Sequence, residues 1–144
     1  MSKKTSRAKA KDKAWVAFSR FIRTRDCIRF SGYPDRGQCV TCKANKLFTE
    51  LQAGHFIGGR GNAVLFDERI VYSQCYYCNA KPPRGLGGNY VEYFVFMEQE
   101  WGREKIDEFR ALKATTKIYK EFHFVELEQE FKDKTKKLLD NIPL

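Results

Sequence analysis

Four cysteines in two C-x-x-C pairs have the spacing of a metal site. Cys39 and Cys42 form the first pair, and Cys75 and Cys78 form the second. A C-x-x-C turn directs two thiolates at one point, and two such turns complete the tetrahedral sulfur shell that suits Zn²⁺. The four cysteines therefore predict one structural zinc ion.

Two disulfide bonds are the alternative for these cysteines, and they fit the rest of the sequence poorly. The chain has five cysteines, so Cys27 would be left without a partner. It begins with Met-Ser-Lys-Lys and has no hydrophobic signal segment, whereas disulfides persist mainly in secreted proteins. We therefore expect a cytoplasmic protein with reduced cysteines.

A histidine and an asparagine beside the cysteine pairs suggest chemistry on phosphodiesters. His55 lies between the pairs, and its neutral imidazole could take a proton from a water molecule near pH 7. Asn79 follows the last cysteine, and its side-chain oxygen is a hard ligand that suits a catalytic Mg²⁺ or Mn²⁺. Arg60, in a glycine-rich segment, could grip a phosphate with its guanidinium. The alternatives are a packing histidine, a helix-capping asparagine and a surface arginine.

The positive charge of the chain is concentrated at its start. The net charge is +9, and residues 1–26 contain nine Lys or Arg but only two Asp. Such a block favours contact with the phosphates of a nucleic acid, although a solvated tail or an anionic membrane surface would also accept it. No apolar run is long enough to cross a bilayer. We expect DNA as the partner and no membrane insertion.

The pattern of apolar residues predicts an α+β fold. Residues 1–12 lack large apolar side chains and are expected to be a flexible basic arm before a single domain at 13–144. In that domain a zinc-stapled core spans about 38–92, and a helical extension spans about 93–144. Short strands are expected at 48–57 and 69–73, and helical spacing marks the segments 13–26, 90–101 (capped by Asn89), 106–112 and 120–139.

Several motifs resemble the NinG (Rap) recombination nucleases of lambdoid phages, which belong to the HNH or His-Me finger superfamily. These motifs are the two cysteine pairs, Gln52-Ala-Gly-His55-Phe, Arg60-Gly-Asn62, Phe66-Asp-Glu-Arg69, Gln74-Cys75-x-x-Cys78-Asn79 and Gly88-Asn89-Tyr-Val-Glu92-Tyr93. The resemblance runs from about residue 14 to the C-terminus.

This resemblance implies a ββα-metal core flanked by N- and C-terminal helices. It implies a metal-dependent endonuclease that acts in recombination on branched DNA such as Holliday junctions, with His55, Asn79 and Arg60 as site residues. The setting would be the cytoplasm of a phage-infected or prophage-carrying bacterium. Symmetric junction cleavage would call for a homodimer, for which the apolar face of the C-terminal helices is the candidate interface.

Two positions depart from the wider HNH pattern. Many members have an aspartate ligand directly before the histidine, where this chain has Gly54, and Ile70 stands where an asparagine usually orients the histidine. Four other polar residues could supply the missing ligands, and the sequence does not choose among them: Gln52, Asn62, Asp67 and Glu92.

Two other classes of function share parts of this sequence. A non-catalytic zinc module that binds nucleic acid would also have paired cysteines and a basic arm. A protein-interaction adaptor would use the helical extension. The nuclease interpretation is favoured because neither alternative needs a histidine and an asparagine beside the cysteine pairs.

Overall fold

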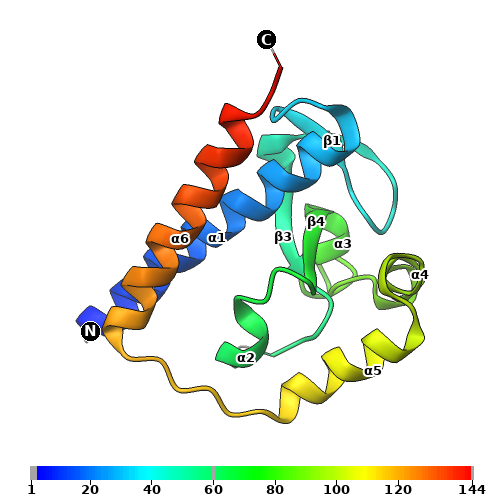
Figure 1. Cartoon of the computed structure of the whole chain (residues 1–144). Helices are drawn as coiled ribbons and strands as arrows, with labels where there is room; N and C mark the ends of the chain where they lie inside the picture. Colours follow the sequence, from blue (N-terminus) through cyan, green and yellow to red (C-terminus); the bar gives the residue numbers. More distant parts are fainter. Residues whose placement is uncertain (1–2, 60, 144) are drawn as a thin grey trace.

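The computed structural model describes residues 3–59 and 61–143. In this part of the chain the fold is α+β, with six α-helices and two antiparallel two-stranded sheets. Helices α1 and α6 lie on one side of the sheets, and α4 and α5 lie on the other (Figure 1). The helices are α1 Ser6–Ser31, α2 Asn62–Leu65, α3 Tyr76–Asn79, α4 Tyr90–Trp101, α5 Arg103–Ala111 and α6 Glu121–Asp140. The strands are β1 Arg36–Gln38, β2 Asn45–Leu47, β3 Leu51–His55 and β4 Val71–Cys75.

Helix α1 is longer than the segment 13–26 that the sequence predicted. It begins after Thr5, whose hydroxyl accepts a hydrogen bond from the backbone N–H of Ala8, and it ends at Gly32 in the left-handed conformation. The expectation of a flexible arm over residues 1–12 is therefore wrong from Ser6 onward. Small, helix-favouring alanines and a buried Ala10 extend the helix into the basic segment, where the pattern of large apolar residues gave no sign of it.

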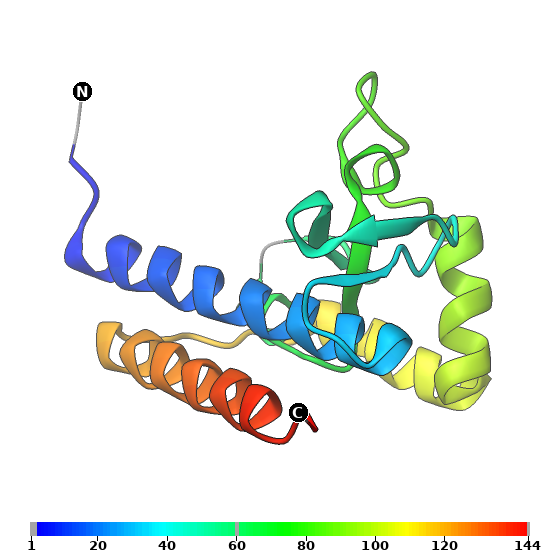
Figure 2. The same ribbon diagram turned by 90° about the horizontal axis from the view of Figure 1, so that it is seen from above.

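Helices α1 and α6 pack side by side and run in the same direction (Figures 1 and 2). Phe131 of α6 meets Phe18 and Phe21 of α1 at ring-centroid distances of 4.8 and 5.4 Å. At the start of both helices, Arg7 donates a hydrogen bond to the carbonyl of Tyr119. The apolar face of α6, which the sequence offered as a dimer interface, is thus covered by α1 within the same chain.

Removing the ring of Phe131 should test this helix pair. Phe131 is 2% exposed, so Phe131→Ala leaves a cavity and is expected to lower the free energy of unfolding by about 3–5 kcal/mol in a denaturant titration. Phe122→Ala on the same helix is the matched control, because Phe122 is 53% exposed and should cost about 0.5 kcal/mol or less. Equal losses in the two variants would contradict the packing of α6 on α1.

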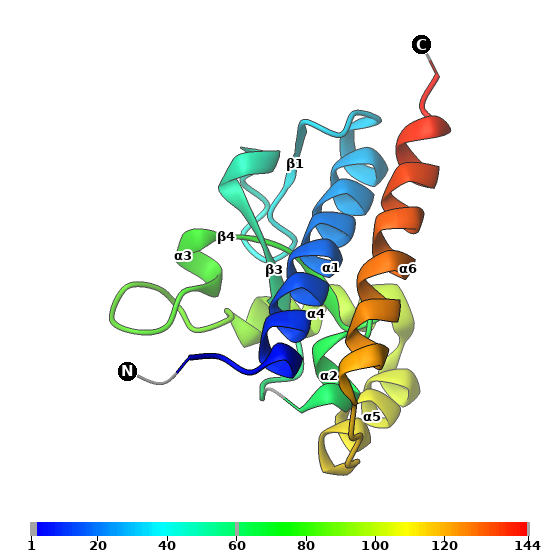
Figure 3. The ribbon, with the colours of Figure 1, turned by 90° about the vertical axis from the view of Figure 1, so that its left-hand side faces the viewer.

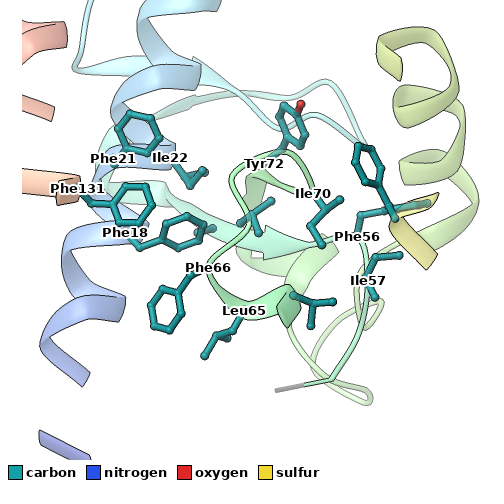
Figure 4. Close-up of a cluster of buried hydrophobic side chains, with 14 of the residues drawn as sticks. Phe18, Phe21, Ile22, Phe56, Ile57, Leu65, Phe66, Ile70, Tyr72 and Phe131 are labelled. Carbon is teal, nitrogen blue, oxygen red and sulfur yellow. The ribbon is translucent and has the colours of Figure 1, made fainter. Parts of the chain in front are cut away.

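The β3–β4 hairpin lies at the centre of the fold. Its register pairs Gln52 with Gln74 and His55 with Val71, so the strand that ends in the histidine is held by the strand that ends in Cys75. Aromatic and aliphatic side chains from α1, α2, α6 and the hairpin form one buried cluster beside it (Figure 4). Strand β3 lies inside the predicted segment 48–57 and is half its length, and β4 begins and ends two residues after the predicted segment 69–73.

Helix α4 is fixed to the hairpin by one buried tyrosine. The hydroxyl of Tyr93 donates a hydrogen bond of 2.7 Å to the carbonyl of Gly54. Gly102 ends the helix where the sequence predicted. Asn89, however, does not cap it through its side chain: its backbone is left-handed with φ 49°, and its amide donates to Cys78 Sγ at 3.5 Å. Asn89 thus occupies the N-cap position of α4, where its carbonyl accepts the N–H of Tyr93, while its side chain contacts the cysteine cluster.

Candidate metal and catalytic site

The two cysteine pairs come together in space. The Sγ atoms of Cys39, Cys42, Cys75 and Cys78 all lie within 4.8 Å of one another, and all four cysteines are free. The Sγ atoms of Cys42 and Cys75 are 3.8 Å apart. A tetrahedral site with Zn–S bonds of about 2.3 Å has its sulfurs roughly 3.8 Å apart, so the cluster could hold one zinc ion.

Local backbone geometry explains why each pair converges. In the first turn, Lys43 adopts a left-handed φ of 66° and its N–H bonds back to the carbonyl of Cys39. In the second, Cys75 ends β4 and caps α3, because its sulfur accepts the N–H of Cys78 at 3.5 Å. Each turn therefore folds its two cysteines close together, and in the second turn a backbone N–H also contacts a sulfur.

Burial and hydrogen bonding act on these thiols in opposite directions. Burial disfavours the thiolate of Cys39, but hydrogen bonds from the backbone of Cys42 and the hydroxyl of Thr41 outweigh it and lower the pKa of Cys39 to about 6. Loss of hydration inside the cluster, together with the nearby sulfurs of Cys39 and Cys75, raises the pKa of Cys42 to about 12, and burial also raises the pKa of Cys75. A zinc ion held by Cys39, Cys42, Cys75 and Cys78 would remove this conflict, since its charge would keep all four sulfurs ionised.

His55 is held in one orientation at the end of β3. Its Nε2 lies 3.0 Å from the carbonyl oxygen of Leu65 in α2, and its ring stacks on Trp15 of α1 at 5.2 Å between centroids. A carbonyl only accepts hydrogen bonds, so this contact places the proton of the neutral ring on Nε2 and the lone pair on Nδ1. The side chain has the tautomer that a general base acting through Nδ1 needs.

The backbone carbonyl of Leu65, and not a side chain at position 70, orients the ring of His55. Ile70, which stands at that position in the sequence, is fully buried in the apolar core and has no polar group to offer. Sequence reasoning missed Leu65, and it also missed the stacking of Trp15 on the histidine. A backbone acceptor leaves no side-chain motif, so only the placement of α2 beside β3 reveals it.

Asn79 lies at the end of the short helix α3, not at the start of a long one. Its Nδ2 donates a hydrogen bond of 2.8 Å to Gln52 Oε1 on β3, so its side chain does not act as a helix cap. The next helix, α4, follows only after a loop at 80–89 that stands away from the body of the molecule (Figures 2 and 3). The run Lys81-Pro-Pro-Arg-Gly-Leu-Gly-Gly88 predicts such a loop, whereas the sequence pattern gives no sign of the short helix α3.

The two catalytic candidates approach β3 from different sides. Gln52 and His55 are three residues apart on one strand, and successive side chains of a strand alternate between its faces. The side chain of Gln52, which contacts Asn79, therefore points to the opposite face of β3 from the side chain of His55. His55 is therefore on one face of β3, and Asn79 contacts the side chain of Gln52 on the other face.

The remaining candidates have different surroundings. Arg60 lies outside the described residues. The carboxylate of Asp67 forms an ion pair with Arg69 at 2.7 Å, which occupies it. Glu92 is exposed in the first turn of α4. Asn62 donates from Nδ2 to the carbonyl of Lys117, while its Oδ1 is buried and accepts no hydrogen bond from the described residues. Gln52 alone of the four lies against Asn79.

The fold and the cysteine cluster together define a small α+β protein with a site that could hold a zinc ion. The chain belongs to the NinG family: the model of that family, described as bacteriophage lambda NinG protein, matches residues 2–141. Comparisons with curated proteins and with solved structures give no match. Among the described helices, none is both long and apolar enough to cross a membrane.

Proposed function

We propose that this NinG-family protein is a divalent-cation-dependent DNA endonuclease of the HNH type, with a structural zinc ion in the cysteine cluster. The observation that carries the proposal is the hydrogen bond between His55 Nε2 and the Leu65 carbonyl. This hydrogen bond selects the neutral tautomer of His55 that has its lone pair on Nδ1, which is the form that a general base needs. His55 ends strand β3, which lies between the two cysteine pairs in the sequence. The family and the resemblance of the motifs support the same reaction class.

In this proposal His55 starts the reaction by accepting a proton at Nδ1 from the attacking water. Asn79 and a second oxygen donor hold Mg²⁺ or Mn²⁺, and Arg60 contacts the phosphate. Amide oxygens are suitable hard ligands, and the hydrogen bond from Nδ2 to Gln52 turns Asn79 Oδ1 away from that residue. When bound, the cation supplies Lewis-acid stabilisation of the charge on the phosphate and the leaving 3′ oxygen.

The substrate proposed is branched or single-strand-containing DNA, and the assembly on a symmetric junction is a homodimer. The experiment that tests the function uses zinc-loaded protein with Mg²⁺ or Mn²⁺ and labelled single-stranded, duplex, flap and four-way-junction DNAs. Cation-dependent cutting of at least one structure supports the endonuclease, and cutting of the junction supports the branched substrate. Failure to cut any of them would reject the proposal.

The exposed charges of α1 should contribute to DNA affinity. Lys9, Lys13 and Arg20 are exposed at spacings of four and seven residues, which places them along one face of the helix. Changing all three to glutamine should weaken binding and reduce the slope of log K against log salt by about 0.9 for each phosphate that is no longer neutralised. The measurement is binding to one labelled duplex over a range of salt concentrations.

A charge change elsewhere is the control for this salt slope. Lys105 lies on α5, where it pairs with Glu108 at 2.9 Å, and Lys105→Gln should leave the slope unchanged. Substitution inside α1 is preferable to deletion of residues 1–11, because deletion would also remove the start of the helix and the hydrogen bond from Arg7 to Tyr119. An unchanged slope in the triple variant would assign these charges to another role.

A second candidate is a zinc-containing module that binds nucleic acid without cutting it. The stacking of His55 on Trp15, with ring planes 19° apart, favours this alternative because it gives the histidine a packing role. The same four-DNA assay separates the two functions. The module predicts binding without cleavage in the wild-type protein, and the endonuclease predicts that binding and cleavage occur together.

A further inference from the structure

Gln74 is a buried residue of β4 whose amide has a fixed orientation. It is 0% exposed, and its Nε2 donates to the carbonyl of Gly88 at 2.8 Å and to Thr41 Oγ1 at 3.1 Å. A carbonyl cannot donate, so the nitrogen of the amide must face Gly88. The direction of the other amide atom, the oxygen, follows from this.

The oxygen of this amide lacks a hydrogen bond. Gln74 Oε1 is buried and has no hydrogen-bond partner among the described residues. A buried amide oxygen without a donor is uncommon in folded proteins and is often explained by a bound water molecule or ion. The atom is therefore a candidate ligand that the sequence did not mark.

Gln74 Oε1 points at the residue before the histidine. A Cβ atom built on Gly54 would overlap with this oxygen, and Gly54 is not among the glycines with positive φ. The glycine is thus required by the space that the Gln74 amide occupies, and not by its backbone conformation. Position 54 is where many HNH proteins carry an aspartate ligand, so an amide oxygen from β4 stands in the place of that side chain.

Gln74 lies on the same face of the hairpin as the proposed ligand Asn79. Gln52 is the cross-strand neighbour of Gln74, and side chains that face each other across a strand pair share one face. Asn79 is hydrogen-bonded to Gln52. The amides of Gln74 and Asn79 therefore flank the same residue, whereas the other unpartnered oxygen of β4 within the described chain, Ser73 Oγ, leaves the opposite face.

We propose that Gln74 Oε1 is a ligand of the catalytic cation, together with Asn79, in place of the aspartate that is absent at position 54. This inference rests on the proposed function. Both ligands are neutral, so the cation takes its charged partners from the DNA phosphates. Mg²⁺ or Mn²⁺ should accordingly bind weakly to the free protein and more tightly in the presence of DNA.

Paramagnetic broadening in the wild-type protein tests this proposal without any substitution. Zinc-loaded, ¹⁵N-labelled protein is titrated with Mn²⁺ in the presence of a short DNA duplex, and the side-chain amide signals are followed by NMR. The signals of Gln74 and Asn79 should broaden at the lowest Mn²⁺ concentrations, before that of Gln129 on α6. Gln74 and Asn79 signals that broaden no earlier than that of Gln129 would overturn the proposal.

A charge substitution provides a second test. Gln74→Glu replaces a neutral ligand with a carboxylate and should tighten Mn²⁺ binding about tenfold, measured by the EPR signal of free Mn²⁺. Gln99→Glu, at an exposed position of α4, adds the same charge outside the site and should leave the affinity unchanged. Zinc content is measured on both variants, so that a loss of fold is recognised. Equal Mn²⁺ affinity in a folded Gln74→Glu variant would contradict ligation by residue 74.

Failure of this proposal can be distinguished from failure of the proposed function. If the wild-type protein cuts DNA and the folded Gln74→Glu variant binds Mn²⁺ no more tightly than the wild type, the endonuclease stands and Gln74 is not a ligand. If the protein cuts none of the DNAs and Mn²⁺ broadens neither amide, both proposals are rejected.

Discussion

Replacing His55 with alanine is expected to abolish most DNA cleavage while leaving DNA binding intact. The attacking water would lose its proton acceptor, and loss of a general base typically costs about two to four orders of magnitude in rate. The phosphate contacts and the cysteine cluster do not depend on the imidazole. The measurement is the single-turnover cleavage rate with saturating Mg²⁺, together with DNA affinity and zinc content.

The chain contains one other histidine, which provides the control for His55→Ala. His123 lies on α6, where its Nδ1 accepts the backbone N–H of Lys120 at 2.9 Å. His123→Ala should therefore retain wild-type cleavage. Full cleavage in His55→Ala would remove the catalytic role of the β3 strand. Loss of folding in that variant would instead identify the stacking on Trp15 as the main role of the ring.

Replacing Cys75 with serine is expected to release zinc and unfold the centre of the protein. The free energy of binding of a structural zinc ion, about 10–16 kcal/mol in zinc-finger peptides, is comparable with or larger than the whole stability of a domain. Cys75 also ends β4 and caps α3, so its loss acts on the hairpin and on Asn79. Metal analysis should find about one zinc per wild-type chain and almost none in the variant, with a lower thermal midpoint.

Cys27→Ser is the matched control for Cys75→Ser. Cys27 is also free and fully buried, but it lies in α1, outside the four-cysteine cluster. The control should keep its zinc and lose only the stability associated with a buried hydroxyl. A zinc-free Cys75→Ser variant with an unchanged thermal midpoint would show that zinc does not stabilise this fold.

The features that the sequence predicted well depend on local spacing. The two-residue spacing within each C-x-x-C pair sets the geometry of its turn, and the four cysteines of the two turns meet in one cluster. The apolar period of the segment 120–139 and the glycine after the segment 90–101 located α6 and the end of α4 within a residue or so. In each case the determining residues are neighbours along the chain, so a pattern in the sequence carries the information.

The features that it missed depend on residues distant along the chain. The Leu65 carbonyl reaches His55 only because α2 folds back beside β3. Asn89 stands at the N-cap of α4 as predicted, but its side-chain amide donates to a sulfur of the cysteine cluster, which no sequence pattern indicates. The amide of Gln74 occupies the space that a side chain at position 54 would need, and this explains why the residue there is a glycine. A backbone carbonyl that accepts a hydrogen bond has no characteristic residue type, and neither does a space that the side chain of a neighbouring strand fills. Neither feature can therefore be recognised as a motif in the sequence.

The most direct test of the endonuclease is a cation titration of cleavage with the zinc-loaded wild-type protein. A labelled four-way junction is incubated with excess protein, first without added divalent cation and then with increasing Mg²⁺ or Mn²⁺. We predict no cutting without the cation, a rise in rate to saturation with it, and loss of that rate in His55→Ala. A zinc-loaded protein that binds the junction and leaves it intact at every cation concentration would contradict the proposal.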